Sequence, residues 1–225
     1  MVLAQRGTVT ELIVDGVFAM DTVDTATEHA LARLALDEWR SAMHGSDGAR
    51  VLVGGLGLGF TVRALLDDAR VAHVHVVELH PSVVAWARAG LLPQPSSLLA
   101  DPRLTLSVGD VLEVLPRLPE GCVDAVLLDV DNGPGFLIHP ANEAVYGADF
   151  LATVLRLLAA GGVLAVWSAD RAPALADAMV AAGATCREVT LPVRRDGREL
   201  EYALYVARPR TGRRTEPRTE PRTLP

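Results

Sequence analysis

The chain has 225 residues, half of them hydrophobic and 22% charged, which is a globular composition and excludes disorder along the whole length. The formal net charge is −7, and the last 17 residues carry five Arg and two Glu, or +3, so the remaining body stands at −10. An acidic body argues against a protein that mainly binds nucleic acid, and no apolar run approaches the ~18 residues that span a bilayer.

The first elements along the chain form a predicted β-hairpin over residues 8–20. Asp15-Gly16 is a strong turn dipeptide between two β-prone runs. A helix is expected next, because Thr25 and Glu28 have the spacing of a capping box and apolar residues recur with helical periodicity behind them.

From Arg50 onward, apolar strands alternate with helical stretches. The predicted strands are Val51–Gly54, His73–Glu78, Leu104–Val108, Val123–Asp129, Gly162–Ser168, Thr185–Val193 and Glu199–Ala207. The predicted helices are Leu58–Asp68, Pro81–Ala89, Val111–Leu115, Ala141–Ala159 and Ala172–Ala182. Continuous apolar strands indicate a parallel sheet covered on both faces, and the last two strands read as an antiparallel hairpin.

This order predicts an α/β fold, a doubly wound Rossmann-like sheet of five parallel strands plus a C-terminal antiparallel pair. It is the strand plan of class I S-adenosylmethionine (SAM) dependent methyltransferases, in which ligands bind at the carboxyl ends of the strands. We expect an N-terminal β-hairpin segment (1–24), the SAM-binding domain (25–208) and a disordered basic tail (209–225), whose Thr-Glu-Pro-Arg repeat has no apolar periodicity.

A glycine turn follows the first strand of this sheet. Gly55, Gly57 and Gly59 give the pattern GxGxG, which lets a ligand lie against bare backbone. The dinucleotide fingerprint GxGxxG is not met, so the spacing favours a SAM-type nucleoside over NAD. A tight turn without a ligand is the structural alternative.

Acidic residues close the next two strands. Glu78, about 20 residues past the glycines, is placed to accept both ribose hydroxyls, unless it is only an exposed strand-end charge. Asp110 is placed to accept from the adenine amino group. It also fits as the N-cap of the following helix, and both roles can hold together.

The fourth strand ends in Asp129-Val-Asp131-Asn132, followed by a Gly/Pro loop. Asp129 is expected beside the reacting centre, where a carboxylate can position an amine or remove its proton. Asp131 and Asn132 then face the acceptor, or else belong to a solvated loop. His139 and Tyr146 in the next segment either line the site or serve packing.

Histidine and cysteine patterns support neither a metal site nor disulfides. His73, His75 and His80 are close in sequence, but no carboxylate–histidine cluster has ligand spacing. Cys122 and Cys186 form no CxxC pair, and the N-terminus lacks the long apolar core of a signal peptide. We therefore expect a cytoplasmic protein without a metal.

Several segments together resemble the spermidine synthase (polyamine aminopropyltransferase) family. They are LIVDGVFAMDTVDTATEH, VLVGGLGLG, VVELHP, VGD and LLDVDNGPG, over about residues 10 to 206. The resemblance implies a homodimer, a ribose-binding Glu78, an adenine-binding Asp110 and a catalytic Asp129. It also puts Glu28 at the place of a catalytic tyrosine, with His29 beside it.

Departures from the family pattern concern the donor and the acceptor. The acid of the family's glycine loop falls on Gly57, the second loop acid on Asn132, and a later tyrosine on Val193. Without the acid at Gly57, the carboxylate of intact SAM is no longer repelled.

Three functions remain open from the sequence. The favoured one is methyl transfer from SAM to a small acceptor, with Asp129 and Glu28 as catalytic residues. The alternatives are aminopropyl transfer from decarboxylated SAM to a polyamine, and a non-catalytic SAM or nucleoside-binding protein. In each case the partner is a small molecule, with an amine as one candidate for the transferases, and neither nucleic acid nor membrane is expected.

Overall fold

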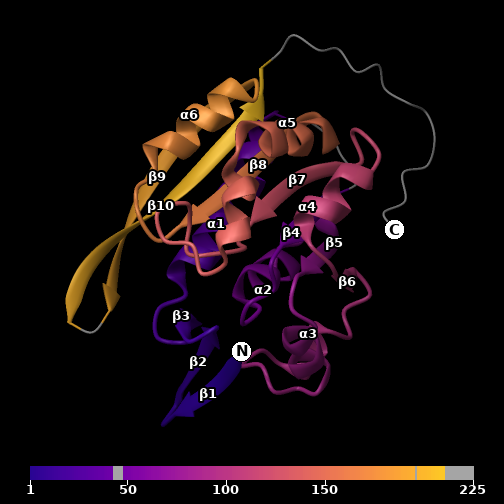
Figure 1. Ribbon diagram of the computed structural model, residues 1–225. Coiled ribbons are helices and arrows are strands. Elements are labelled where there is room, and N and C mark those ends of the chain that lie inside the picture. Colours follow the sequence, from indigo (N-terminus) through magenta and orange to yellow (C-terminus); the bar gives the residue numbers. More distant parts are fainter. Residues whose placement is uncertain (43–47, 196, 211–225) are drawn as a thin grey trace.

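The computed structural model describes residues 1–42, 48–195 and 197–210. Within this part of the chain, a seven-stranded sheet forms the centre, and a three-stranded antiparallel sheet lies near the carboxyl ends of its parallel strands (Figure 1). The predicted disorder of the basic tail lies, from residue 211 onward, outside the described residues. None of the described helices is long and apolar enough to cross a membrane.

The large sheet has the predicted order of parallel and antiparallel strands. Its first five strands are parallel, and the last two pair antiparallel to their neighbours. In spatial order they are β6 (Leu104–Val108), β5 (Val71–Glu78), β4 (Ala49–Gly54), β7 (Val123–Leu128), β8 (Leu158–Ser168), β10 (Arg198–Pro209) and β9 (Ala184–Arg195). The predicted α/β fold is confirmed.

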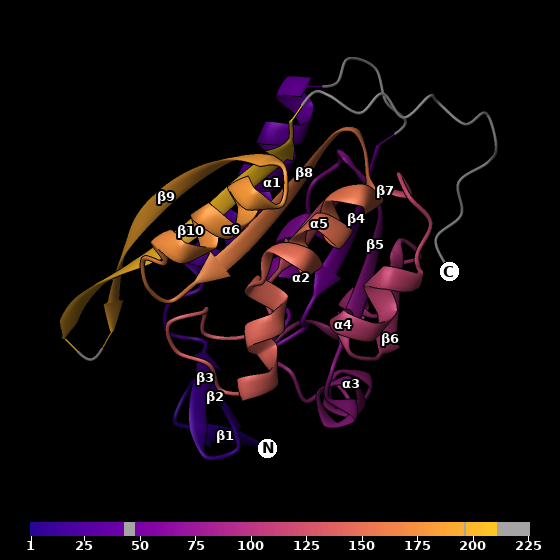
Figure 2. The ribbon, with the colours of Figure 1, turned by 45° about the horizontal axis from the view of Figure 1, so that its top comes forward.

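Helices cover both faces of this sheet, which explains why its central strands are apolar throughout. Side chains of α1 (Ala26–Ala42), α2 (Phe60–Leu66) and α3 (Pro81–Arg88) belong to the core on one face. Those of α4 (Val111–Val114), α5 (Ala148–Leu157) and α6 (Pro173–Ala181) belong to the core on the other. Figure 2 shows α5 and α6 on the near side of the sheet.

The N-terminal segment contains more than the predicted hairpin. β2 (Val9–Val14) and β3 (Val17–Asp21) form that hairpin around Asp15-Gly16, but β1 (Val2–Arg6) adds a strand on its other edge. Asp15 has a φ of 51° and Gly16 a φ of 81°, the left-handed pair that a tight hairpin turn requires. α1 begins directly after Thr25, as the capping-box spacing predicts.

Several element boundaries differ from the sequence prediction, and two of the differences change the course of the chain. The helix expected over residues 141–159 is divided, because Gly147 is extended (φ −75°, ψ 147°) between a 3-10 helix, η3 (Pro140–Tyr146), and α5. The tail was expected to begin at Pro209, but Pro209 ends β10, and the Arg210 N–H donates to the Gly183 carbonyl at 2.9 Å. Shorter 3-10 helices are η1 (Ser96–Leu98) and η2 (Leu115–Arg117).

Candidate active site

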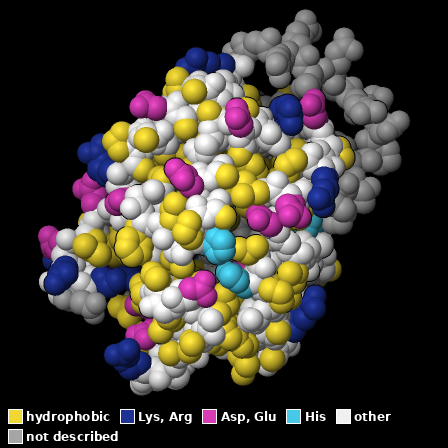
Figure 3. Space-filling view, viewed as in Figure 1, with side chains coloured by type: hydrophobic (Ala, Val, Ile, Leu, Met, Phe, Trp, Pro, Cys, Tyr) yellow, Lys and Arg dark blue, Asp and Glu magenta, His cyan; other side chains and the backbone are white. Residues whose placement is uncertain are grey.

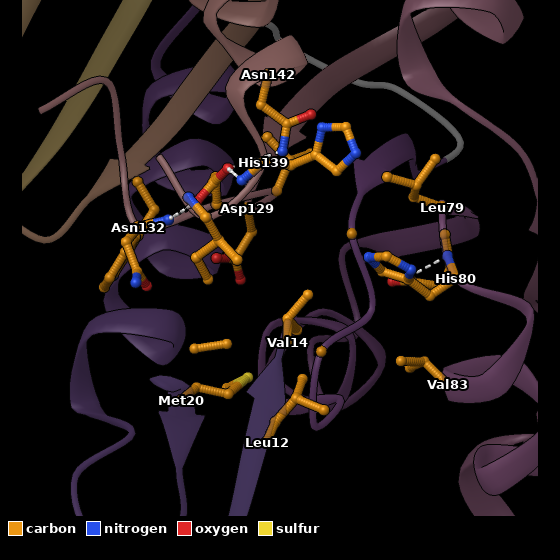
Figure 4. A pocket seen from close by; sticks show the side chains of 18 of the residues that line it. Leu12, Val14, Met20, Leu79, His80, Val83, Asp129, Asn132, His139 and Asn142 are labelled. Atoms are coloured by element: carbon orange, nitrogen blue, oxygen red, sulfur yellow. Dashed lines mark hydrogen bonds between the residues drawn. The ribbon is translucent and has the colours of Figure 1, made fainter. Parts of the chain in front are cut away.

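A pocket lies at the carboxyl ends of the central strands β4, β5 and β7, and residues of the N-terminal sheet cover it. The predicted strand-end residues and the apolar side chains Leu12, Val14 and Met20 face each other across it (Figure 4). Figure 3 shows acidic and histidine side chains gathered at the centre of this face of the molecule. The predicted residues that line the pocket are Glu28, Gly55, Gly57, Glu78, Asp110, Asp129, Asp131, Asn132 and His139.

The glycine turn brings bare backbone to the pocket, and two of its glycines need that freedom. Gly55 has a φ of 90°, and a Cβ there would collide with the Asp129 carbonyl. Gly57 has a φ of 52°, and a Cβ there would lie 2.6 Å from the Met20 sulfur. Met20 also lies 3.2 Å from the Leu58 nitrogen, so a thioether from the N-terminal sheet covers the turn. Sequence reasoning missed this contact, since nothing local to either segment signals it.

Gly59, the third glycine of the pattern, is not among the described residues that line the pocket. It caps α2 with a φ of 87°, and its missing Cβ faces the side chain of Gln94. Its position in the turn starts the helix, and the ligand contact expected at Gly59 stays a prediction.

Glu78 ends β5 as a buried carboxylate with two backbone donors already in place. Oε2 accepts from Leu56 N–H at 2.7 Å, and Oε1 accepts from His80 N–H at 2.8 Å. A carboxylate offers about four acceptor positions, so roughly two remain for neighbouring hydroxyl groups. Glu78 is thus locked in orientation and still able to bind a diol.

Asp110 takes the N-cap position of α4, where its Oδ1 accepts from Leu112 N–H at 2.8 Å. It also lines the pocket, next to Gly109 and Val111. Asp110 therefore does act as the N-cap of α4, and this role leaves its second carboxylate oxygen available for a ligand.

Asp129 stands between the glycine turn and the opposite wall of the pocket. Its Oδ2 accepts from the Thr61 hydroxyl at 2.7 Å, which fixes the carboxylate from α2. Burial, with the nearby charge of Glu78 adding to it, raises the pKa of Asp129 to about 6. The carboxylate is therefore a stronger proton acceptor than an exposed aspartate.

Glu28 reaches the same pocket from the first turn of α1. The Trp167 indole donates to the Thr27 hydroxyl at 3.1 Å, and this hydroxyl donates to Glu28 Oε2 at 2.8 Å. Burial, and after it the charge of Asp129, raise the pKa of Glu28 from 4.5 to about 7. Two carboxyl groups of raised pKa therefore face one cavity.

This raised pKa makes stability depend on pH. The folded chain holds the Glu28 proton more tightly than the unfolded chain does, so this stabilising contribution is present below pH 4.5 and is lost as pH rises to about 7. The wild type should lose this contribution between pH 4 and pH 8, whereas Glu28→Gln has no carboxyl group to titrate at this position. The unfolding free energy of the variant minus that of the wild type should therefore be roughly 3 kcal/mol higher at pH 8 than at pH 4. Denaturant unfolding at several pH values measures this, with Glu120→Gln at an exposed position as the control. A pH-independent difference would contradict it.

Asp131 organises the loop after β7. Its Oδ1 accepts from the N–H groups of Asn132 at 2.7 Å and Ile138 at 2.8 Å, and its Oδ2 accepts from the Asn142 amide at 2.8 Å. Asn132 donates to the Phe18 carbonyl at 3.1 Å and so ties this loop to the N-terminal sheet. Both residues line the pocket, and the hydrogen bonds of their side chains shape its wall.

Of three further candidate residues, one lines the pocket and two do not. His139 lines the pocket on an exposed loop. His29 does not, because the helical turn that points Glu28 inward points its neighbour outward, where its ring nitrogen lies 2.8 Å from the Thr25 carbonyl. Tyr146 is also outside the pocket lining, buried behind the loop with a hydrogen bond to the Gly133 backbone, and burial raises its pKa.

Sequence reasoning missed three residues of the wall opposite Glu78. Trp167 is the penultimate residue of β8, Tyr202 lies on β10, and their rings meet edge to face with centroids 5.1 Å apart. Arg195, at the end of β9, completes this wall. The position of Trp167 at the carboxyl end of a parallel strand was the available signal. Within the described residues, no group of three or more histidine, cysteine or acidic side chains is placed to hold a metal ion.

The open sheet with its pocket at the carboxyl ends is the Rossmann-like fold of class I SAM-dependent enzymes. No protein-family model matches the chain. A polyamine aminopropyltransferase of Mycobacterium tuberculosis is 34% identical over 124 residues, 54% of this chain and 23% of the relative. Spermidine synthase 1 of Pisum sativum is 34% identical over 115 residues, 51% of this chain and 33% of the relative.

The solved structures agree with these relatives. A spermidine synthase crystallised with the transition-state analogue AdoDATO matches with a TM-score of 0.69 and 17% identity, over 88% of this chain and 66% of that chain. The predicted spermidine synthase-like resemblance is thereby confirmed in sequence and fold. The matched segment spans a third or less of the length of the two curated relatives.

Proposed function

We propose that this chain is a transferase that moves an aminopropyl group from decarboxylated SAM to an amine. Its sequence relatives are named as aminopropyltransferase and spermidine synthase, and these names support aminopropyl transfer over the methyl transfer that the sequence analysis favoured. The observation that carries the proposal is the convergence of Glu78, Asp110, Asp129 and Glu28 on one pocket.

The donor half of the pocket fits a nucleoside. Glu78 has acceptor capacity left for two ribose hydroxyls, and Asp110 has a carboxylate oxygen left for an exocyclic amino group. The bare backbone at Gly55 and Gly57 leaves room for the ligand's approach. Apolar side chains such as Val83 line the same end.

The donor supplies a carbon made electrophilic by a positively charged sulfur. The amine lone pair forms the new N–C bond, the C–S bond breaks with both electrons going to sulfur, and a proton leaves the nitrogen. Asp129 and Glu28 are the groups that orient the amine and accept this proton, since burial raises the pKa of each. Orientation in a half-enclosed pocket supplies much of the remaining rate enhancement.

One departure bears on the choice of donor. The space beside Gly57 is taken by the Met20 sulfur, where the family pattern has an acid. This contact neither attracts an ammonium group nor repels a carboxylate, so it is the observation that keeps intact SAM as a second candidate donor.

Calorimetry and product analysis test the proposal. We expect binding of decarboxylated SAM and methylthioadenosine, and an aminopropylated product by mass spectrometry when amines are added. A methylated product from intact SAM would replace aminopropyl transfer by methyl transfer. Binding without any product across an amine panel would support a non-catalytic nucleoside binder, and absence of nucleoside binding would overturn the proposal.

A further inference from the structure

Arg195 is a cation in a pocket whose other charged groups are mostly carboxylates. It lies at the end of β9 and lines the pocket together with Glu28, Trp167 and Tyr202. Its side chain is only 16% exposed, which is unusual for an arginine without a close, well-formed ion pair. It adds a positive charge to the pocket from β9, which lies on the other side of the central strand β4 from β5 and its Glu78.

The hydrogen-bonding capacity of this guanidinium is incompletely used. Its Nη2 lies 3.5 Å from Asp21 Oδ1, and that oxygen is already held by the Val23 N–H at 2.9 Å. Its Nε is buried and has no hydrogen-bond partner in the described part of the chain. The Phe18 ring lies 4.9 Å from the guanidinium carbon and restricts its orientation. A buried N–H donor without a partner is unfavourable, so the described residues leave this guanidinium incompletely satisfied.

The charges around the acceptor end suit a zwitterion better than a diamine. Arg195 and Glu28 both line the pocket, and the positive charge of Arg195 weakly favours the ionised form of the Glu28 carboxyl. An ammonium group suits Glu28 and Asp129, but a second ammonium beside Arg195 would be repelled. A carboxylate beside Arg195 would be attracted by its positive charge.

We propose that the acceptor amine also carries a carboxylate, as an amino acid does, and that Arg195 binds this carboxylate. The inference rests on the proposed function, because it assigns the acceptor half of the same pocket. The transfer step is unchanged: the amine nitrogen forms the N–C bond, the C–S bond breaks, sulfur keeps the electron pair, and the nitrogen proton passes to Asp129 or Glu28. The carboxylate of the acceptor takes no part in bond making.

The test compares acceptors that differ only in the carboxylate. Ornithine and putrescine form one such pair, and lysine and cadaverine another. Calorimetry with protein saturated with methylthioadenosine should give at least ~10-fold tighter binding of the amino acid in each pair, the scale of one charge-assisted hydrogen bond to a carboxylate. The same titrations without the nucleoside show whether the preference belongs to the pocket itself.

Arg195→Gln should remove this preference, and Arg195→Lys, which keeps the charge, should retain part of it. The neighbouring Arg194 is the matched control, because it is 84% exposed and pairs with Glu199 on the outer side of the hairpin. Arg194→Gln should leave the preference unchanged. Melting temperatures of the variants separate misfolding from loss of recognition.

The outcomes separate this inference from the proposed function. If the wild-type protein does not bind methylthioadenosine, the result counts against the proposed function. Normal nucleoside binding with equal or tighter binding of putrescine, or with no binding of either acceptor, overturns the inference alone. Weaker binding of intact SAM but not of methylthioadenosine in Arg195→Gln also overturns it, because the guanidinium would then serve a donor carboxylate.

Discussion

Asp129→Asn is expected to lower turnover by ~100-fold or more while donor affinity changes little. The substitution keeps the shape of the side chain and one oxygen that can accept from the Thr61 hydroxyl, now 2.7 Å from Oδ2. It removes the negative charge and the basicity that burial gives this carboxyl, whose pKa is raised to about 6. Positioning of a protonated amine and removal of its proton are therefore both lost, and steady-state kinetics with a productive acceptor measures the effect.

Asp131→Asn is the matched control for this experiment. Asp131 lies on the same loop and lines the same pocket, but its oxygens already accept from the loop's own donors, including Ile138 N–H at 2.8 Å. We expect that change to raise acceptor KM and to lower stability, with a smaller effect on kcat. Near-wild-type turnover in Asp129→Asn would remove Asp129 from the mechanism and shift the role of proton acceptor to Glu28.

The fold and the convergence of the strand-end carboxylates were predictable because they depend on local pattern. Continuous apolar runs located the parallel strands, and the carboxyl ends of neighbouring parallel strands meet at one edge of the sheet. Glu78, Asp110 and Asp129 each lie at the end of such a run or within two residues of it, so their convergence needed no knowledge of long-range contacts. The hairpin at Asp15-Gly16 was also predictable, because its turn and its two strands are adjacent in sequence.

Other features of the pocket were not predictable, because they depend on contacts between distant segments. Met20 meets Gly57 only after the N-terminal sheet folds over the strand ends. Arg195 reaches the pocket through the length of β9, which extends two residues past the predicted end at Val193. His29 was placed beside Glu28 by sequence adjacency, and helix geometry turns it away.

Glu78→Ala is expected to weaken nucleoside binding by about 1.5–3 kcal/mol, or roughly 10- to 150-fold, the scale of lost hydrogen bonds to a charged group. The carboxylate is buried and oriented by two backbone donors, so its remaining lone pairs are preorganised for a ribose diol. Calorimetry with methylthioadenosine measures the loss without requiring a known acceptor.

The same substitution has a structural cost that the binding experiment must separate. Removing the carboxylate leaves the N–H groups of Leu56 and His80 without their acceptor, which should destabilise the glycine turn by roughly 1–3 kcal/mol. Glu78→Gln keeps a carbonyl oxygen for one of these donors and should lose less stability than the alanine variant, while still losing the charge that strengthens ribose binding. A large drop in affinity in both variants, with a smaller drop in melting temperature for glutamine, supports direct contact with the ribose. Unchanged affinity in either variant at a temperature where it is folded would remove Glu78 from the nucleoside site.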